Sequence, residues 1–301
     1  MKKNIAILGA TGFIGKVITR FFVDTKKVNA FLASKKGGKC NGFTVDPVDL
    51  TKEDSLINWL GEKKIDCIID LSSLVPYSFD ENEWKTFFLN CRMHQQVLQY
   101  WQHRKCHLIY ASSCSVYGEG RNIQFSEATV PLPNNYYAIS KLNGEYLFLK
   151  EHSENDCPLT VLRINAPYGF KEQRKTVVNI FIENALKGDP LKLMGTGKRE
   201  QDFIYVEDVA LAFWLAFKKK KYGLYNIASG HSVTMNQLAK LIVQEADSSS
   251  NIVFGPHEDP QEGCKVRINI GRAKKELDFK PKYDLVKGLQ KMIALYRGRK
   301  Y

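Results

Sequence analysis

Apolar runs of strand length alternate with amphipathic segments of helix length along the first half of the chain. Apolar runs cover residues 3–8, 28–32, 64–71, 107–111 and 159–164, and segments with helical spacing cover residues 16–23, 81–102 and 135–152. Runs that are apolar throughout predict strands buried on both faces, and their alternation with helices predicts parallel pairing. We therefore expect an α/β fold, with a doubly wound, mostly parallel sheet and helices on both of its faces.

The alternation ends near residue 169. Beyond it the predicted elements are shorter and mixed, apart from an apolar helix at residues 209–217. We expect residues 1–169 to form the sheet domain, and residues 170–301 mainly a smaller mixed α/β C-terminal lobe with some segments that return to the sheet. Ligands of open α/β sheets bind beyond the carboxyl ends of the strands. Gly9, Ser34, Leu71, Ser113 and Asn165 lie at such ends.

A glycine-rich turn joins the first predicted strand to the first helix. Its sequence runs from Gly9 through Gly12 to Gly15. Gly9 permits a tight turn, Gly12 lets the backbone approach a pyrophosphate, and Gly15 allows the helix to pack closely on the strand. An anion binds at the start of such a helix, where N–H groups are unpaired. The turn predicts a dinucleotide site; the alternative is an ordinary strand-to-helix turn.

The end of the second strand bears on which dinucleotide is bound. An NAD site usually places a carboxylate there for the ribose 2′-hydroxyl, but this chain has Ser34, Lys35 and Lys36. Cations bind a 2′-phosphate that a carboxylate would repel. The segment therefore favours NADP(H), with NAD(H) as the alternative cofactor and a solvated loop as the structural alternative.

A tyrosine and a lysine four residues apart, Tyr137 and Lys141, share one face of the helix predicted at residues 135–152. The ammonium favours the phenolate and so lowers the tyrosine pKa from its ordinary value of about 10. Bringing that pKa near 7 requires about 4 kcal/mol. Such a tyrosine exchanges protons with a carbinol or carbonyl oxygen at neutral pH. The same spacing recurs elsewhere in the chain, so the motifs around this pair decide its role.

Charge, cysteine content and hydropathy restrict the class of protein. The net charge is +12, but the basic residues are spread out, and the densest run, at 218–221, follows an apolar helix whose C-terminus it stabilises. We expect small anionic ligands and no nucleic acid. No segment resembles a membrane span or a signal peptide, so no membrane association is expected. Seven cysteines without a C-x-x-C predict unpaired thiols in the cytoplasm, and the histidines show no metal-ligand spacing.

Seven motifs in order resemble one superfamily. They are Gly9-x-x-Gly12-x-x-Gly15, Asp49-Leu50-Thr51, the nine residues from Tyr110 to Gly118, Tyr137-x-x-x-Lys141, the seven residues from Arg163 to Gly169, the segment from Gly195 to Val209, and Arg267 ahead of Lys274. In this order and spacing the chain resembles the extended short-chain dehydrogenase/reductase superfamily, in its nucleotide-sugar epimerase/dehydratase branch. The resemblance implies a Rossmann fold and a nucleotide-diphosphate sugar as substrate.

The resemblance also implies roles for single residues. Ser113 matches the Ser/Thr that hydrogen-bonds the reacting sugar oxygen, Tyr137 the acid/base, and Lys141 the lysine that also bonds the nicotinamide ribose. Asp49 matches an acid that contacts adenine, with a helix N-cap as the alternative. We predict these cofactor-binding residues: Gly9, Thr11, Gly12, Phe13, Ile14, Gly15, Ser34, Lys35, Lys36, Asp49, Leu50, Leu71, Tyr137 and Lys141. We predict these substrate-binding residues: Ser113, Cys114, Asn165, and the diphosphate-binding arginines Arg199 and Arg267.

Departures from the family pattern narrow the expected reaction. The 4,6-dehydratases of this branch carry Asp-Glu directly after the Ser/Thr, where this chain has Cys114 and Ser115. Neither side chain is a competent acid or base by default at neutral pH, so dehydration is not expected. Relatives also often have Asn where Ala166 stands, next to Asn165.

The remaining reactions move a hydride at a sugar carbon. We expect an NADP(H)-dependent reductase of a nucleotide-linked 4-keto-(6-deoxy)sugar, with an NAD-dependent nucleotide-sugar 4-epimerase as the alternative. A third alternative is an inactive dinucleotide-sensing or interaction protein, against which the retained Ser113, Tyr137 and Lys141 argue. In relatives the helices at 81–102 and 135–152 pair across a dimer, so a homodimer is expected. The apolar residues Phe87, Phe88, Val97, Leu98 and Trp101 fit that interface or packing on the sheet.

Overall fold

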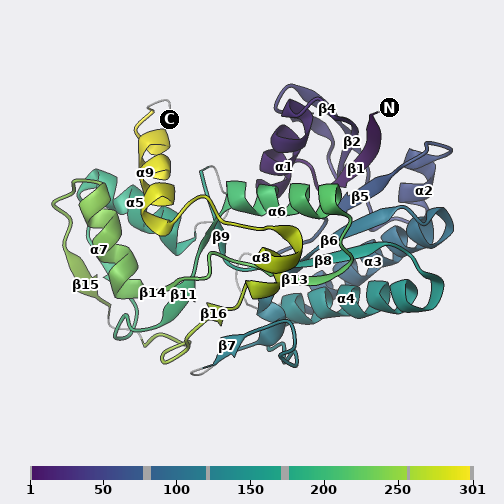
Figure 1. Cartoon of the computed structure of the whole chain (residues 1–301). Helices are drawn as coiled ribbons and strands as arrows, with labels where there is room; N and C mark the ends of the chain where they lie inside the picture. Colours follow the sequence, from purple (N-terminus) through teal and green to yellow (C-terminus); the bar gives the residue numbers. More distant parts are fainter. Residues whose placement is uncertain (1, 77–82, 120–122, 171–175, 256–257, 299–301) are drawn as a thin grey trace.

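A computed structural model describes residues 2–76, 83–119, 123–170, 176–255 and 258–298. Its centre is an eight-stranded sheet in the order β13-β8-β6-β5-β1-β2-β4-β3. Every neighbouring pair is parallel except β3 and β4, which form an antiparallel hairpin. The doubly wound, mostly parallel sheet predicted from the sequence is confirmed (Figure 1). The strands are β1 Lys3–Leu8, β2 Val28–Ser34, β3 Gly38–Cys40, β4 Phe43–Pro47, β5 Cys67–Asp70, β6 His107–Ser113, β8 Leu159–Ile164 and β13 Gly223–Ile227.

Helices cover both faces of this sheet. On one face lie α1 (Phe13–Asp24) and α6 (Val206–Lys219), with α8 (Gly271–Leu277) beside them; on the other lie α2 (Ser55–Leu60), α3 (Glu83–Arg104) and α4 (Tyr136–Asn155) (Figure 1). The sheet has an apolar core on each face. Successive residues of β1 belong to the two cores alternately, because side chains along a strand point to opposite faces. Ile5 and Ile7 pack under α1 and α6, whereas Ala6 and Leu8 pack under the opposite helices.

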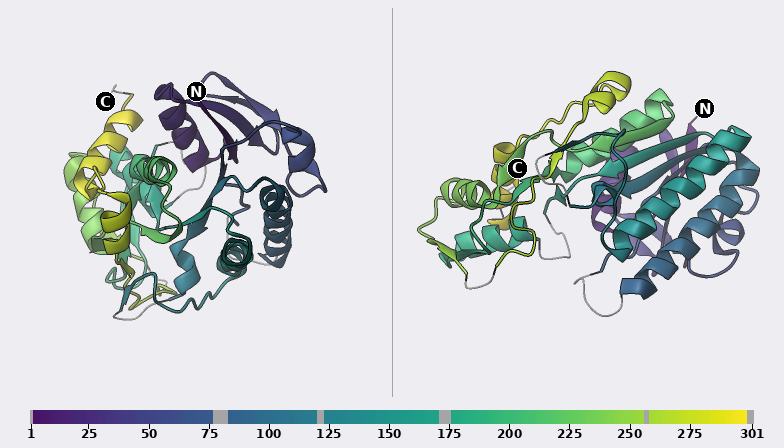
Figure 2. Two further views of the ribbon diagram at one scale, coloured as in Figure 1. Left: turned by 45° about the vertical axis from the view of Figure 1, so that its right-hand side comes forward. Right: turned by 90° about the horizontal axis from the view of Figure 1, so that it is seen from below.

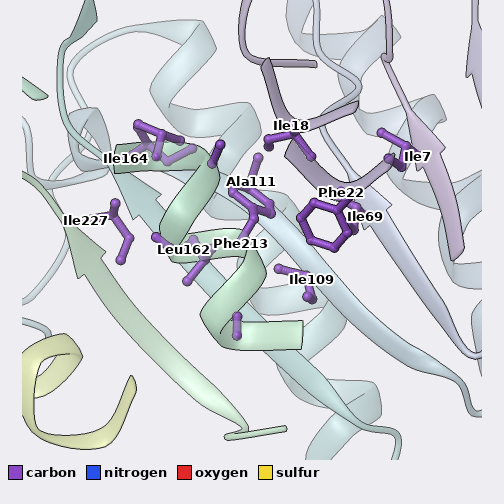
Figure 3. Packing of buried hydrophobic residues seen from close by; sticks show 14 of the residues in the cluster. Ile7, Ile18, Phe22, Ile69, Ile109, Ala111, Leu162, Ile164, Phe213 and Ile227 are labelled. Carbon is purple, nitrogen blue, oxygen red and sulfur yellow. The ribbon is translucent and has the colours of Figure 1, made fainter. Parts of the chain in front are cut away.

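The core on the α1 and α6 face is built from aromatic and branched side chains. Phe22 and Phe213 belong to one buried cluster with the sheet residues Ile69, Ile109 and Leu162 (Figure 3). All five side chains are fully buried. This packing fixes α1, and with it the turn from β1 into α1, against the sheet.

A second group of elements lies to one side of the sheet (Figure 2). It contains α5 (Val177–Lys187), α7 (Met235–Glu245), α9 (Leu285–Tyr296) and the parallel pair β10 (Leu191–Leu193) and β15 (Ile252–Phe254), which share a separate apolar core. Short pairs connect it to the sheet: β9 (Pro167–Tyr168) with β12 (Ile204–Tyr205), β11 (Glu200–Asp202) with β14 (Ser232–Thr234), and β16 (Arg267–Ile268) with β7 (Gln124–Phe125). The division at residue 169 stays a prediction, while β13 and α6 join the main sheet and its helices.

The predicted elements differ from the observed ones mainly at their ends. The helix expected at 16–23 begins at Phe13, the strand expected at 64–71 is only Cys67–Asp70, and the strand expected at 28–32 continues to Ser34. The start expected for the helix at 81–102 lies outside the described residues. The hairpin of β3 and β4 was not predicted, because β3 has only three residues and carries a glycine and a lysine, which are typical of loops.

Two further expectations concern cysteines and membranes. All seven cysteines are unpaired, and all but Cys91 are buried, as the sequence predicted. Among the described helices none combines the length and the apolar character that crossing a membrane requires.

Candidate active site

The turn between β1 and α1 has room only for glycine at two of its positions. Gly9 has φ +76°, and a Cβ there would lie 3.0 Å from the backbone of Leu71. A Cβ on Gly15 would overlap the carbonyl oxygen of Gly9. Gly12 is the N-cap of α1, and no side chain caps the helix or places an acid in its first turn. The first N–H groups of α1 are therefore available to an anion, and the turn fits the pyrophosphate of a dinucleotide.

Two adjoining cavities open at this turn. Their volumes are about 530 Å³ and about 180 Å³, and both are lined by Gly9, Gly12, Leu71, Ser73 and Leu74. They lie at the carboxyl ends of β1, β2, β5 and β6, which is where a doubly wound sheet binds its ligands. Every predicted cofactor-binding residue lines one of them except Lys36, which is exposed beside Lys35.

The larger cavity contains the predicted catalytic residues. It is lined by Ser113, Tyr137 and Lys141 together with Phe13, Ile14 and Gly15 of the turn. Asn135 begins α4, because its side chain accepts a hydrogen bond from the Ala138 N–H at 2.9 Å. Residues Tyr137 and Lys141 thus fall in the first two turns of α4. The Nζ of Lys141 lies 5.9 Å from the ring centre of Tyr137.

Lys141 is almost completely buried, with 3% of its surface exposed. Its Nζ donates a 2.8 Å hydrogen bond to the carbonyl oxygen of Ala111 at the end of β6. Burial lowers the pKa of Lys141 to about 8, although the charges of Asp70 and Glu145 act in the opposite direction. The ammonium is therefore held in a fixed place beside Tyr137 and is close to its titration point at neutral pH.

Ser113 ends β6 with its hydroxyl oriented by a neighbour. Its Oγ accepts hydrogen bonds from the backbone N–H and the hydroxyl of Ser115, at 3.2 Å and 2.9 Å. A hydroxyl has one proton and two acceptor sites. Since Ser115 occupies the acceptor sites, the proton of Ser113 is available to a ligand oxygen in the larger cavity.

The smaller cavity contains the predicted residues that follow β2. It is lined by Ser34, Lys35 and Asp49, with Leu50 and Thr11 nearby. The Nζ of Lys35 lies 3.4 Å from a carboxylate oxygen of Asp49. The hydroxyl oxygen of Ser34 is buried and has no hydrogen-bond partner in the described part of the chain. A ribose hydroxyl or 2′-phosphate in this cavity would satisfy it.

Asp49 does not cap a helix. Its carboxylate accepts hydrogen bonds from the N–H of Thr51 at 3.1 Å and from the Thr51 hydroxyl at 2.7 Å, whereas the N-cap of α2 is Asp54. Partial burial raises the pKa of Asp49, but the bonds from Thr51 and Lys35 outweigh it and hold that pKa below its ordinary value. The group is therefore a carboxylate at neutral pH, as an adenine contact requires.

Two predicted substrate-binding residues, Cys114 and Asn165, are not among the residues that line either cavity. Cys114 is buried, and its Sγ donates to the carbonyl oxygen of Arg163 at 3.3 Å. The Nδ2 of Asn165 donates to the carbonyl oxygen of Asp202 at 2.6 Å. Their roles in substrate binding stay predictions. Ala166, the neighbour of Asn165, does line the larger cavity and has φ +32°.

The two predicted diphosphate arginines each hold a carboxylate instead of facing the cavities. Arg199 bonds Asp259 at 2.9 Å and Gln261 at 2.9 Å. Arg267 forms a bidentate pair with Glu200 at 2.8 Å and 2.9 Å. Glu200 in β11 follows Arg199 directly, and β11 lies against β16, so the two arginines belong to one region. A diphosphate there would compete with these carboxylates.

Several site residues were not predicted from the sequence. The larger cavity is also lined by Val75, Ala111, Ser112, Ile164 and Pro167. Asn90, in the middle of α3, fixes the lining residue Leu74: its side chain accepts from the Leu74 N–H at 2.8 Å and donates to the Leu74 carbonyl at 3.0 Å. It also donates to the Ser140 hydroxyl at 3.0 Å and so ties this loop to α4. No motif marks Asn90, because only the fold brings α3 against this loop.

A buried ion pair lies behind the larger cavity. Glu145 of α4 and Arg163 of β8 are bonded at 2.9 Å and 2.6 Å, with 1% and 4% of their side chains exposed. Ser112, which lines the cavity, donates its hydroxyl proton to Glu145. The pair therefore connects α4, which carries Tyr137 and Lys141, to the sheet beside the larger cavity.

Comparison with known proteins agrees with this geometry. A family model described as the NAD dependent epimerase/dehydratase family matches residues 5–228. The dTDP-4-dehydro-6-deoxyglucose reductase of Escherichia coli is 25% identical over 324 residues, which cover 98% of each chain. A putative UDP-glucose 4-epimerase of Methanocaldococcus jannaschii is 30% identical over 191 residues, which cover 62% of this chain and 61% of that protein.

A solved structure shows the same fold. The UDP-glucose 4-epimerase of Thermotoga maritima, crystallised with UDP-glucose, superposes with a TM-score of 0.89 at 23% identity, covering 98% of this chain and 99% of that one. Because the family model spans most of the sequence and the expected site residues gather at one edge of the sheet, the protein belongs to the NAD-dependent epimerase/dehydratase family of extended short-chain dehydrogenases/reductases and is an enzyme of that family.

Proposed function

We propose that this enzyme is an NADP(H)-dependent nucleotide-sugar oxidoreductase that reduces a nucleotide-linked 4-keto-(6-deoxy)sugar. The observation that carries the proposal is the larger cavity, where Ser113, Tyr137 and Lys141 share one space with the glycine turn. The preference for NADP(H) is supported by the end of β2, where the buried hydroxyl of Ser34 has no described partner and Lys35 and Lys36 are exposed.

The three polar side chains supply what reduction of a carbonyl requires. A bound nicotinamide dinucleotide supplies the hydride. Tyr137 donates its phenolic proton to the carbonyl oxygen as that oxygen gains negative charge. Ser113 donates a hydrogen bond to the same oxygen, and the ammonium of Lys141 stabilises the phenolate that remains.

The residues beside Ser113 support a reaction without dehydration. Cys114 is buried, and burial holds the pKa of its thiol well above the ordinary value. Ser115 uses its hydroxyl proton on Ser113. Neither group is placed to remove or deliver a proton at C5 or C6 of a sugar.

An NAD-dependent 4-epimerase is the second candidate. The relative from M. jannaschii is named a putative UDP-glucose 4-epimerase, and the same Ser113, Tyr137 and Lys141 would serve oxidation and return of the hydride at C4. The ion pair between Lys35 and Asp49 also bears on this alternative, because a lysine bound to a carboxylate attracts a 2′-phosphate less strongly.

A homodimer through α3 and α4 is part of the proposal. The two helices pack side by side, as Figure 2 shows, and carry exposed aromatic side chains: Phe88 is 57% exposed and Tyr146 60%. Val97 and Trp101 are instead buried in the core under these helices. The unpaired cysteines support a reducing compartment, and we propose the cytoplasm.

Cofactor identity and exchange test the proposal. The purified protein is denatured, any released nucleotide is identified, and the emptied protein is titrated with NADPH and with NADH. An empty site that prefers NADPH, followed by NADPH oxidation with one of a panel of nucleotide-linked 4-keto-6-deoxy sugars, is the expected result. Tightly held NAD(H) would mean an epimerase. Cofactor binding without turnover on either kind of substrate would support the inactive, dinucleotide-sensing alternative.

A further inference from the structure

A third cavity lies at the opposite edge of the sheet from the glycine turn. Its volume is about 520 Å³, and it is lined where β6 begins at His107, where α3 ends at Arg104, and along the last turns of α6. These are the amino ends of the parallel strands, so the cavity is separate from the proposed cofactor and substrate site. Its size is that of a small-molecule pocket.

Positive charge dominates the lining of this cavity. The basic residues are Lys3, Lys27, Arg104, Lys105, Lys218 and Lys220, and the single acid is Asp66, which Lys3 binds at 2.8 Å. Lys27, Lys218 and Lys220 form no ion pair with any residue that the structure describes. The cavity is therefore complementary to a ligand with more than one negative charge.

The helix dipole explains only part of this arrangement. Lys218 and Lys219 occupy the last turn of α6, where cations are favourable. Lys219, however, pairs with Asp278 and does not line the cavity. Three aromatic rings, those of Trp214, Phe217 and Tyr222, line the cavity beside the lysines, and 41% of Tyr222 is exposed. Lysines that only solvate the end of a helix need no aromatic side chains beside them, so these rings are not explained by the helix end.

A buried acceptor without a partner adds to this pattern. His107 lines the cavity, is 6% exposed, and lies edge-on to Tyr222 with 5.3 Å between the ring centres. The hydroxyl of Thr160 donates to a backbone carbonyl, so it accepts from Nε2 of His107 at 2.8 Å. Burial and the charge of Lys220 lower the pKa of His107 to about 4, so Nδ1 is an unprotonated acceptor. No described residue bonds it.

We propose that this cavity is a second ligand site that binds a nucleoside diphosphate. Lys27, Lys218 and Lys220 take the phosphates, and the exposed ring of Tyr222 takes the base, since every base has a face that stacks on an aromatic side chain. An amino or hydroxyl donor of the ligand satisfies Nδ1 of His107. The combination of unpaired cations, the exposed ring of Tyr222 and an acceptor matches a nucleotide better than it matches a simple inorganic anion.

Binding of ADP to the NADPH-saturated enzyme tests the proposal. Saturation with NADPH blocks the cofactor cavities but not the proposed nucleotide-sugar site, which has its own affinity for nucleotides. Equilibrium dialysis with labelled ADP at low salt is therefore compared between the wild type and a variant of the third cavity. We expect one bound ADP per chain that depends on this cavity. Lys218→Glu combined with Lys220→Glu should raise its Kd about tenfold or more, because two charge-assisted contacts become repulsive.

Matched variants distinguish ADP binding in this cavity from a general effect of net charge on ADP affinity. Lys187→Glu with Lys192→Glu makes the same charge change, and Lys187 lies in the last turn of α5 as Lys218 lies in the last turn of α6. This control should change the Kd by less than about twofold. Tyr222→Ala should weaken ADP about tenfold while leaving pyrophosphate binding unchanged. The proposal would be overturned if ADP did not bind at millimolar concentration, or if the control variant lost as much ADP affinity as the double variant of the cavity. It would also be overturned if pyrophosphate bound as tightly as ADP, or if single-stranded DNA bound more tightly.

Discussion

Glu145→Gln removes one charge of the buried pair behind the proposed active site while keeping the size of the side chain. Arg163 would then lie in the core without a counter-charge, because only 4% of its side chain is exposed and its bonds at 2.9 Å and 2.6 Å go to Glu145. The Nη1 of Arg163 already has no described hydrogen-bond partner. The remaining amide oxygen of glutamine replaces one acceptor but not the charge.

The expected cost follows from the burial. Removing one partner of a buried ion pair typically costs about 3–5 kcal/mol. Glutamine retains one acceptor, which places the expected loss near the lower end, at about 3 kcal/mol. At roughly 2 °C per kcal/mol for a chain of this size, the melting temperature should fall by about 6 °C.

Urea unfolding followed by circular dichroism measures this loss. The control is Glu154→Gln, the same substitution on the same helix, where Glu154 pairs with Lys150 at the surface with 57% of its side chain exposed. Such exposed pairs contribute about 0–1 kcal/mol. If Glu145→Gln unfolded at the same urea concentration as the control, the reasoning from burial would be refuted.

Three further predictions concern the proposed catalytic and cofactor-binding residues. Tyr137→Phe should lower turnover by about 10²–10⁴ while leaving NADPH affinity within about twofold, whereas its exposed neighbour Tyr136→Phe should keep full activity in the same assay. Lys35→Ala combined with Lys36→Ala should raise the Kd of NADPH about tenfold or more and that of NADH much less; equal losses by titration would remove the argument for a 2′-phosphate site. For Lys141, the folded pKa of about 8 lies below the ordinary 10.5, so the unfolded chain binds more protons between these values and stability rises with pH there. Relative to Lys141→Met, the wild type should therefore gain up to about 3 kcal/mol of unfolding free energy between pH 7 and pH 10, and a pH-independent difference would contradict the shift.

Features that depend on a few neighbouring residues could be predicted from the sequence. The turn at Gly9 and Gly15 is fixed by steric limits on backbone and Cβ, and the spacing of Tyr137 and Lys141 becomes proximity on any helix. The fold class could be predicted for the same reason, because the period of apolar residues distinguishes strands from helices.

Features that depend on contacts between distant segments could not be predicted. Asn90 holds Leu74 only because α3 packs against the loop after β5, and nothing in the residues around it differs from an ordinary helix. The carboxylates on Arg199 and Arg267 come from residues 60 and 67 positions away. A sequence motif can identify an arginine, but it does not show which carboxylate pairs with that arginine in the absence of a ligand.

The position of β13 at the end of the main sheet has a consequence for how the protein is made. Strand β8 is complete at Ile164, but its neighbour β13 ends at Ile227, and Trp214 of α6, which packs on Phe22 at 5.1 Å, also comes late. Synthesis of residues 170–227 takes about 3–12 s at roughly 5–20 residues per second. During these seconds the nascent chain presents an unpaired parallel strand and an uncovered aromatic core, a state prone to pairing with other chains. A fragment that stops near residue 169 would stay in this state permanently.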